Sequence, residues 1–196
     1  MVGASALDRA ASAIREGDLV VYPTETVYGL GADALDPAAI ERVFAAKRRD
    51  RAEPISLALP TVEAVADLAR PTERERAFCR AFLPGPVTVL LPAADAIPAA
   101  LTAGRDRVGV RVPDHDVALA LLERVAPLTA TSANVSGRPA ARRVADLDEP
   151  IRRAAAVILD GGETPGGGST VVDVSTDTIV RRGARADAVE SWLAEH

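Results

Sequence analysis

The sequence predicts an α/β protein, because segments with helical and strand patterns alternate along its whole length. Apolar residues recur at helical spacing in segments such as 5–16 and 114–125, and short apolar runs of strand length, such as 87–91, lie between them. Helices that alternate with strands are typical of this class. The chain shows no internal repeat, no low-complexity linker and no shift in composition, so one domain over residues 1–196 is the simplest interpretation.

The elements of the first half are marked by clear start and stop signals. The helix at 5–16 is followed by Gly17, a residue that commonly ends helices, and the strand at 18–22 is ended by Pro23. Asp36-Pro37 is an N-cap followed by proline, which predicts a helix that runs to Lys47. The remaining elements are a strand at 55–59 closed by Pro60, a helix at 61–69 capped by Thr61, and a helix from Pro71 to Phe82.

The second half continues the alternation. Residues 83–86 are a tight turn before a strand at 87–91, and 107–112 alternates charged and apolar residues as a half-buried strand does. The other expected elements are a helix at 114–125, a strand at 128–131, a helix at 151–155, a strand at 156–159, a hairpin of 171–174 and 178–181, and a short helix from 187 that carries Trp192.

Composition excludes several classes of protein. The content of 48% hydrophobic and 26% charged residues is that of an ordinary globular protein, no apolar run reaches the length of a membrane span, and the N-terminus lacks a signal-peptide pattern. The single cysteine, Cys79, rules out an internal disulfide, so a cytoplasmic protein without membrane contact is expected. One cysteine and two histidines argue against a metal site built on soft ligands. A net charge of −5 argues against coating nucleic acid by charge alone.

The stretch from Val20 to Gly31 concentrates polar groups directly after a buried strand. It holds both tyrosines of the chain, Tyr22 and Tyr28, with Thr24-Glu25-Thr26 between them. Two interpretations stay open from these residues alone. The threonines can cap their own backbone in a turn, or the stretch can form one wall of a binding site.

Other polar clusters also follow apolar strands, at Arg111-Pro113, Ser132–Ser136 and Ser169-Thr170. Strand ends on one side of an open α/β sheet are where ligands bind, although strand ends are generally polar. The segment 161–168 is rich in glycine. Gly161-Gly162 and residues 166–170 could cradle an anion with backbone N–H groups, but they fit neither standard nucleotide-binding fingerprint.

The basic segment at 47–54 is too polar for the core and reads as a mobile loop. Lys47, the only lysine among 23 basic residues, is followed by Arg49 and Arg51, which an extended chain would point the same way. The segment is either a solvated surface loop or a lid that closes on phosphates.

No nucleophilic triad can be identified in the sequence, because Cys79 is expected in the core and His115 at a helix cap. An enzyme of this sequence would act by positioning and charge.

Taken together, these stretches resemble the YrdC-like family of L-threonylcarbamoyladenylate synthases, in its single-domain form. The motifs occur in the family's order and cover nearly the whole chain. They are Tyr22-Pro23-Thr24-Glu25-Thr26-Val27-Tyr28-Gly29-Leu30-Gly31, Lys47-x-Arg49 with Pro54, Pro84-Gly85-Pro86-x-Thr88, Val110-Arg111-Val112-Pro113, Ser132-Ala133-Asn134-x-Ser136-Gly137, Gly166-x-x-Ser169-Thr170-Val171 and Arg181-x-Gly183.

The resemblance implies a fold, a reaction and partners. The fold is a twisted, largely open mixed α/β sheet with flanking helices around a deep concave cavity. The reaction joins L-threonine, bicarbonate or carbon dioxide, and ATP into threonylcarbamoyl-AMP and pyrophosphate, with Mg²⁺ assisting. A transferase complex then moves the threonylcarbamoyl group to tRNA, so contact with tRNA would be indirect.

The resemblance also implies roles for individual residues. Lys47 and Arg49 would be catalytic. The ATP site would contain Lys47, Arg49, Arg51, Ser132, Asn134, Ala140, Ser169 and Arg181, and the threonine site would contain Thr24, Ser56, Arg111, Ala130 and Ser169. No protein ligand for a metal is expected. Arginine suits these roles because its fork binds carboxylates and phosphates bidentately.

The sequence departs from the family's motifs at two places, and two alternative functions stay open. Asp50 stands where relatives commonly have proline, and Arg181-Arg182-Gly183 replaces Arg-Pro-Gly, so either arginine could face the nucleotide, with Arg181 favoured. One alternative function is a non-catalytic RNA-binding module with a basic concave surface, which the acidic charge and 3% aromatic content disfavour. The other is a synthase that uses carbamoyl phosphate. The related domain with that activity accompanies zinc-finger-like cysteines, which this chain does not have.

Overall fold

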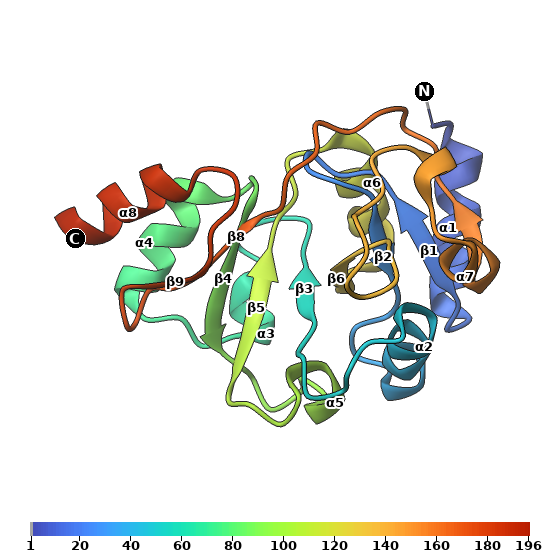
Figure 1. Cartoon of the computed structure of the whole chain (residues 1–196). Coiled ribbons are helices and arrows are strands. Elements are labelled where there is room, and N and C mark those ends of the chain that lie inside the picture. The colour runs from blue at the N-terminus through green and yellow to red at the C-terminus, as the bar shows by residue number, and fades with distance from the viewer. Residues whose placement is uncertain (1) are drawn as a thin grey trace.

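The computed structural model describes residues 2–196 and confirms the α/β class (Figure 1). Its strands form one mixed sheet in the order β7-β1-β2-β6-β3-β5-β4-β8-β9, and the two edge strands do not pair, so the sheet is open. The strands are β1 (Leu19–Tyr22), β2 (Gly29–Gly31), β3 (Ser56–Ala58), β4 (Val87–Pro92), β5 (Arg107–Arg111), β6 (Leu128–Ser132), β7 (Ala155–Ile158), β8 (Thr170–Asp173) and β9 (Thr178–Arg181).

Helices flank this sheet, as the sequence predicts. They are α1 (Ala4–Arg15), α2 (Pro37–Lys47), α3 (Val65–Leu68), α4 (Glu73–Phe82), α5 (Ala99–Thr102), α6 (Asp116–Val125), α7 (Glu149–Ala154) and α8 (Ala186–Glu195), with one 3₁₀ turn at Val144–Asp146. Asp36 caps α2 by accepting a hydrogen bond from the amide of Ala38, and Thr72 forms a capping box with Glu75 at the start of α4. None of the helices in residues 2–196 is long and apolar enough to span a bilayer.

Strand β1 is covered on both faces, which explains its uninterrupted apolar run. Leu19 and Val21 belong to the main apolar cluster together with residues of α2, whereas Val20 and Tyr22 belong to a second cluster with residues of α1 and α6. Successive side chains of a strand point to opposite faces, so each face of β1 is buried under helices. This strand is therefore a fixed base for the segment that follows it.

Three elements differ from the sequence-based expectations. The segment 29–31 forms strand β2, which pairs with β1 and β6, where only a glycine-containing turn was expected. The helix expected at 61–69 is regular only over Val65–Leu68, and α5 was not expected at all. The cap at His115 and the core position of Cys79 are confirmed, since His115 accepts a hydrogen bond from the amide of Val117 and Cys79 is buried.

The glycine-rich segment 160–168 crosses from β7 to β8, which lie in different halves of the sheet (Figure 1). The Tyr28 hydroxyl donates to the carbonyl of Gly162 at 2.7 Å, and the amide of Gly166 donates to the carbonyl of Thr26 at 2.7 Å. The far end of the segment lies against Gly183, where a Cβ atom would come within 2.2 Å of the Gly168 carbonyl oxygen. The segment is thus fastened at both ends and joins the two halves of the sheet.

Candidate functional site

A cavity of about 1270 Å³ opens between the two halves of the sheet. Its walls come from the segment after β1, from β3, β5, β6 and β9, and from the end of the glycine-rich segment. Small-molecule sites usually occupy about 300–1,000 Å³, so this cavity has room for more than one ligand. The lining includes nine of the residues expected from the sequence: Thr24, Arg49, Ser56, Arg111, Ala130, Ser132, Ala140, Ser169 and Arg181.

The lining of the cavity contains more arginines than carboxylates, although the whole chain carries a net charge of −5. Two acidic residues, Glu53 and Asp106, contribute to it. The arginines in the lining are Arg49, Arg105, Arg107, Arg111, Arg142, Arg181 and Arg182. Five of these arginines pair with carboxylates, and within residues 2–196 only Arg105 and Arg181 of this set have no carboxylate partner. Guanidinium groups bind phosphates and carboxylates, so these groups are the expected occupants.

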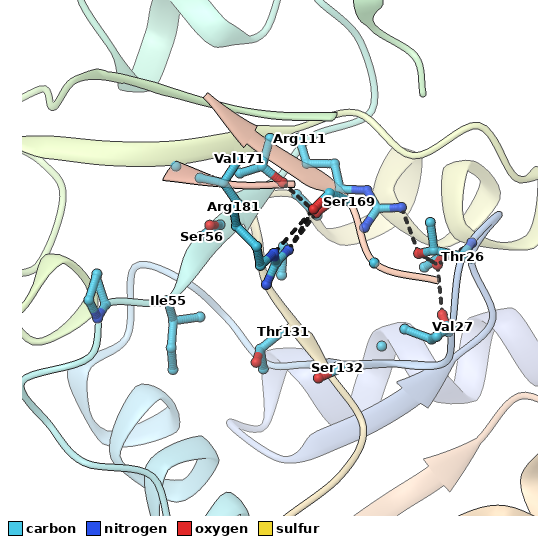
Figure 2. A pocket seen from close by; sticks show the side chains of 18 of the residues that line it. Thr26, Val27, Ile55, Ser56, Arg111, Thr131, Ser132, Ser169, Val171 and Arg181 are labelled. Atoms are coloured by element: carbon cyan, nitrogen blue, oxygen red, sulfur yellow. Dashed lines mark hydrogen bonds between the residues drawn. The ribbon is translucent and has the colours of Figure 1, made fainter. Parts of the chain in front are cut away.

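Arg181 is the best-placed anion ligand of this set. Its guanidinium donates to the Ser169 carbonyl at 2.9 Å and to the Ser169 hydroxyl at 2.9 Å (Figure 2), and no carboxylate within the described residues pairs with it. Burial lowers the pKa of Arg181, and the nearby positive charges of Arg111 and Arg49 lower it further. The guanidinium of Arg181 is thus close enough to those of Arg111 and Arg49 to be repelled by both, and a bound anion would relieve that repulsion.

The segment after β1 satisfies both interpretations that its sequence left open. The Thr24 hydroxyl donates to the Val27 carbonyl at 2.6 Å and accepts from the Thr26 amide at 3.2 Å, as in a turn that caps itself. Thr24 and Thr26 also line the cavity, where the Thr26 hydroxyl accepts a hydrogen bond from Arg111 at 3.0 Å (Figure 2). The self-capped turn therefore holds part of the cavity wall rigid.

The floor beside this segment is the ring of Tyr22, which lies against β2. Cβ atoms added at Gly29 and Gly31 would come within 3.0 Å and 2.9 Å of that ring. Glycine is required on β2 because any larger residue would displace Tyr22. The hydroxyl of Tyr22 is buried, and burial raises its pKa to about 12, so it stays protonated and acts as part of the wall.

Thr88 is a polar residue of the cavity that the sequence-based site did not include. Its hydroxyl lies 3.0 Å from the hydroxyl of Ser169, and only 4% of its surface is exposed. Ser169 is therefore held from two sides, by Thr88 on β4 and by Arg181 on β9. The motif Pro84-Gly85-Pro86-x-Thr88 contained this residue, but nothing in the sequence indicated that its strand lies beside β8.

Three of the expected residues do not line the cavity: Lys47, Arg51 and Asn134. Arg51 lies on the exterior, where its guanidinium donates to the Glu41 carboxylate at 2.6 Å and 2.8 Å. The side chains of Arg49 and Arg51 diverge because α2 continues to Lys47 and Arg48 then adopts a left-handed conformation with φ of 48°. The segment is not extended there, so the expected common direction of the three basic side chains is wrong.

Lys47 is almost fully buried behind the cavity wall. Its ammonium donates to the carbonyl of Asn134 at 2.8 Å and to the carbonyl of Ser132, while the amide of Ser136 donates to the Lys47 carbonyl at 2.8 Å. Asn134 in turn accepts a hydrogen bond from the Ser132 hydroxyl, which faces the cavity. Lys47 and Asn134 thus support the end of β6 from behind.

The burial of Lys47 predicts a pH-dependent stability. Burial and the charge of Arg49 lower the pKa of Lys47 from 10.5 to about 8, while Asp148 opposes the shift. Between pH 8 and 10.5 the unfolded chain binds a proton at Lys47 that the folded chain has released, so stability should increase with pH in this interval. We expect the free energy of unfolding of the wild type to rise by about 2 kcal/mol relative to Lys47→Met. Urea unfolding of both proteins across this interval measures it, and a constant difference would contradict the assignment.

A family model places this fold and site among known proteins. The Sua5/YciO/YrdC model, which carries the description "Telomere recombination", matches residues 12–183. The chain belongs to this family. The match includes every residue expected at the site and every element of the sheet, so it covers the complete cavity.

Two relatives of the chain are named as threonylcarbamoyl-AMP synthases, one of them putative. The threonylcarbamoyl-AMP synthase of Pyrococcus abyssi is 44% identical over 170 residues, which are 85% of this chain and 50% of that protein. The putative threonylcarbamoyl-AMP synthase of Mycobacterium tuberculosis (strain H37Rv) is 35% identical over 178 residues, which are 89% of this chain and 82% of that protein. The chain therefore spans about half the length of the first relative and most of the second.

A solved family structure confirms the fold in detail. The crystal structure of P. abyssi Sua5 complexed with L-threonine superimposes with a TM-score of 0.91 at 39% identity, covering 96% of this chain and 57% of that one. The mixed, open sheet is therefore shared with this family structure.

Few side chains of the described residues are placed to bind a metal ion. Within residues 2–196, no three His, Cys, Asp or Glu side chains lie close enough together to bind a metal ion. In nucleotide sites Mg²⁺ is held largely by the phosphates, with one or two carboxylates and water. The cavity offers two such carboxylates, Glu53 and Asp106, which fits an ion that arrives with a nucleotide.

Proposed function

We propose that the chain is a threonylcarbamoyl-AMP synthase, which joins L-threonine, bicarbonate or carbon dioxide, and ATP into threonylcarbamoyl-AMP and releases pyrophosphate. The observation that carries the proposal is the convergence of Arg49, Arg111 and Arg181 in one cavity with serine and threonine hydroxyls. The names of its relatives support the same reaction. They support a synthase rather than a non-catalytic RNA-binding module.

The phosphates of ATP would lie at the end of the cavity formed by Arg49 and Arg181. Ser132, Ala140 and Ser169 complete this part of the lining, and the hydroxyls of Ser132 and Ser169 can donate to phosphate or ribose oxygens. When the carbamate oxygen attacks the α-phosphorus, negative charge grows on the leaving pyrophosphate. Guanidinium groups fixed in advance stabilise that charge without reorganising.

L-Threonine would occupy the end formed by Thr24, Ser56, Arg111 and Ala130, with Ser169 between the two substrates. Arg111 would bind the α-carboxylate, because a guanidinium can grip a carboxylate with two hydrogen bonds. The other side chains of this set, those of Thr24, Ser56 and Ala130, are small, which suits an amino acid. Binding both substrates in one cavity aligns the carbamate with the α-phosphorus and lowers the entropic cost of reaction.

Lys47 would act as a positioning residue rather than on the phosphates. Its ammonium contacts the carbonyls of Ser132 and Asn134 and fixes the end of β6. Arg51 would have no part in the ATP site, because it pairs with Glu41 outside the cavity. Mg²⁺ would enter with ATP and supply charge neutralisation of the triphosphate, and Glu53 and Asp106 are the two acidic side chains of the lining that could hold it.

The product would be a mixed anhydride, which water hydrolyses readily, so a second enzyme must receive it quickly. We propose a threonylcarbamoyl transferase complex as that partner and tRNA as the final acceptor, with contact to tRNA through the partner. A cytoplasmic location would fit this role and the single, buried Cys79.

The test is release of pyrophosphate from ATP by the 196-residue chain in the presence of Mg²⁺, with mass detection of the adenylate. We expect release that requires both L-threonine and bicarbonate and that falls strongly in Lys47→Ala. Absence of pyrophosphate with all substrates present would refute the synthase. Salt-dependent RNA binding that survives Lys47→Ala would instead favour the RNA-binding module.

A further inference from the structure

Glu25 lies between two residues of the cavity lining, Thr24 and Thr26, and its carboxylate pairs with a third, Arg111. Its carboxylate is 2.8 Å from a guanidinium nitrogen of Arg111, and the two side chains are 15% and 13% exposed. Neither carboxylate oxygen of Glu25 has a well-aligned hydrogen-bond partner, and both are shielded from water. The charge of Glu25 is therefore balanced by Arg111 almost alone, and Arg111 is balanced by Glu25.

The positive charges of Arg181 and Arg49 are less fully balanced by carboxylates than that of Arg111. Arg181 has no carboxylate partner within the described residues and donates to Ser169. Arg49 pairs with Glu53 at 3.1 Å, but Glu53 is 57% exposed, so water screens that pair. The cavity thus has uncompensated positive charge at Arg181, with the screened pair of Arg49 near it, and a mostly buried ion pair without net charge at Arg111.

We propose that Glu25 sorts the two substrates within the cavity. By neutralising Arg111, Glu25 confines polyphosphate to the Arg49–Arg181 end and reserves the Arg111 end for a zwitterionic amino acid. A polyanion gains little at a site of no net charge, whereas a zwitterion has both a carboxylate for Arg111 and an ammonium that excess positive charge would repel. This inference rests on the proposed function, since it assigns the amino acid to Arg111 and the nucleotide to Arg49 and Arg181.

The experiment measures binding of L-threonine by calorimetry in the absence and presence of saturating inorganic triphosphate. In the wild type we expect triphosphate to change the Kd of threonine by less than about twofold. In Glu25→Gln the uncompensated Arg111 should attract triphosphate, so the Kd of threonine should rise by about fivefold or more when triphosphate is present. Glu25→Asp keeps the charge and should behave as the wild type.

Glu41→Gln is the matched control, because it removes the same charge from the Glu41–Arg51 pair outside the cavity. We expect it to leave the coupling between the two ligands unchanged. The proposal is overturned if Glu25→Gln keeps the wild-type coupling, or if Glu41→Gln alters the coupling as much as Glu25→Gln does. A wild type that binds no threonine would refute the proposed function instead, so the two failures are distinguishable.

A second variant covers the case in which Glu25→Gln does not fold. Glu25→Gln with Arg111→Gln replaces both members of the buried pair and leaves no uncompensated charge. We expect it to bind inorganic triphosphate within about twofold of the wild type, whereas Arg181→Gln should weaken that binding by about tenfold or more. If the double variant binds triphosphate as weakly as Arg181→Gln does, Arg111 binds polyphosphate in the wild type. That result would refute the sorting role of Glu25.

Discussion

Replacing Arg181 with glutamine should lower kcat/KM for ATP by about 100-fold or more, the usual consequence of removing one fixed charge that stabilises a transition state. Two arginines of the cavity, Arg105 and Arg181, lack a carboxylate partner in the described chain, and Arg105 is exposed to water. The guanidinium of Arg181 is fixed by Ser169, and its pKa is lowered by burial and by Arg111 and Arg49. Steady-state kinetics with ATP varied at saturating threonine and bicarbonate measures the effect.

Arg182→Gln is the matched control for this change. Arg182 also borders the cavity, but its guanidinium is held outside by Asp187 at 2.7 Å and by Glu190. We expect kcat/KM for ATP to stay within about threefold of the wild type, because loss of an exposed ion pair has small effects. Equal losses in the two variants would show that Arg181 has no special role. A loss confined to Arg182→Gln would assign the nucleotide contact to the second arginine.

The sequence predicted the alternation of helices and strands because each element carries its own signals. Asp36-Pro37 and Thr72 cap α2 and α4 as expected from local chemistry. Strand β2 was missed because Gly29-Leu30-Gly31 has almost no side chains from which a period could be read. Those glycines are required by the ring of Tyr22 on the neighbouring strand, and a single sequence does not show such a contact.

The site was predictable as a set of residue types but not as a set of contacts. Arg111 meets Glu25 and Thr26, which precede it by about 85 residues, only because the sheet order places β5 and the segment after β1 around one cavity. Alternation of basic residues after Lys47 suggested one direction for all of them. Because Arg48 adopts a left-handed conformation, the side chain of Arg51 pairs with Glu41 instead. A positive φ is uncommon for residues other than glycine, so the sequence did not indicate this conformation at an arginine.

Lys47→Met should lower kcat by about 100-fold while KM for ATP changes by less than about fivefold. The ammonium of Lys47 contacts the carbonyls of Ser132 and Asn134 and does not border the cavity, so its loss should displace the end of β6 rather than remove a phosphate ligand. The Asn134 carbonyl would lose its donor, which also costs about 1–3 kcal/mol of stability, whereas the Ser132 carbonyl would keep the amide of Asn134. Urea unfolding and steady-state kinetics on the same preparations measure both effects.

A double-mutant cycle separates a positioning role from direct contact with the substrate. If Lys47 acts by holding Ser132, then Ser132→Ala should add little to Lys47→Met, because the hydroxyl is already displaced in the single variant. The coupling free energy between the two changes should then be about 1 kcal/mol or more. If Lys47 binds the triphosphate independently, the effects on the activation free energy should add, and the coupling should be close to zero. Additive effects together with a large rise in KM for ATP would place the Lys47 ammonium on the phosphates and refute its role behind the wall.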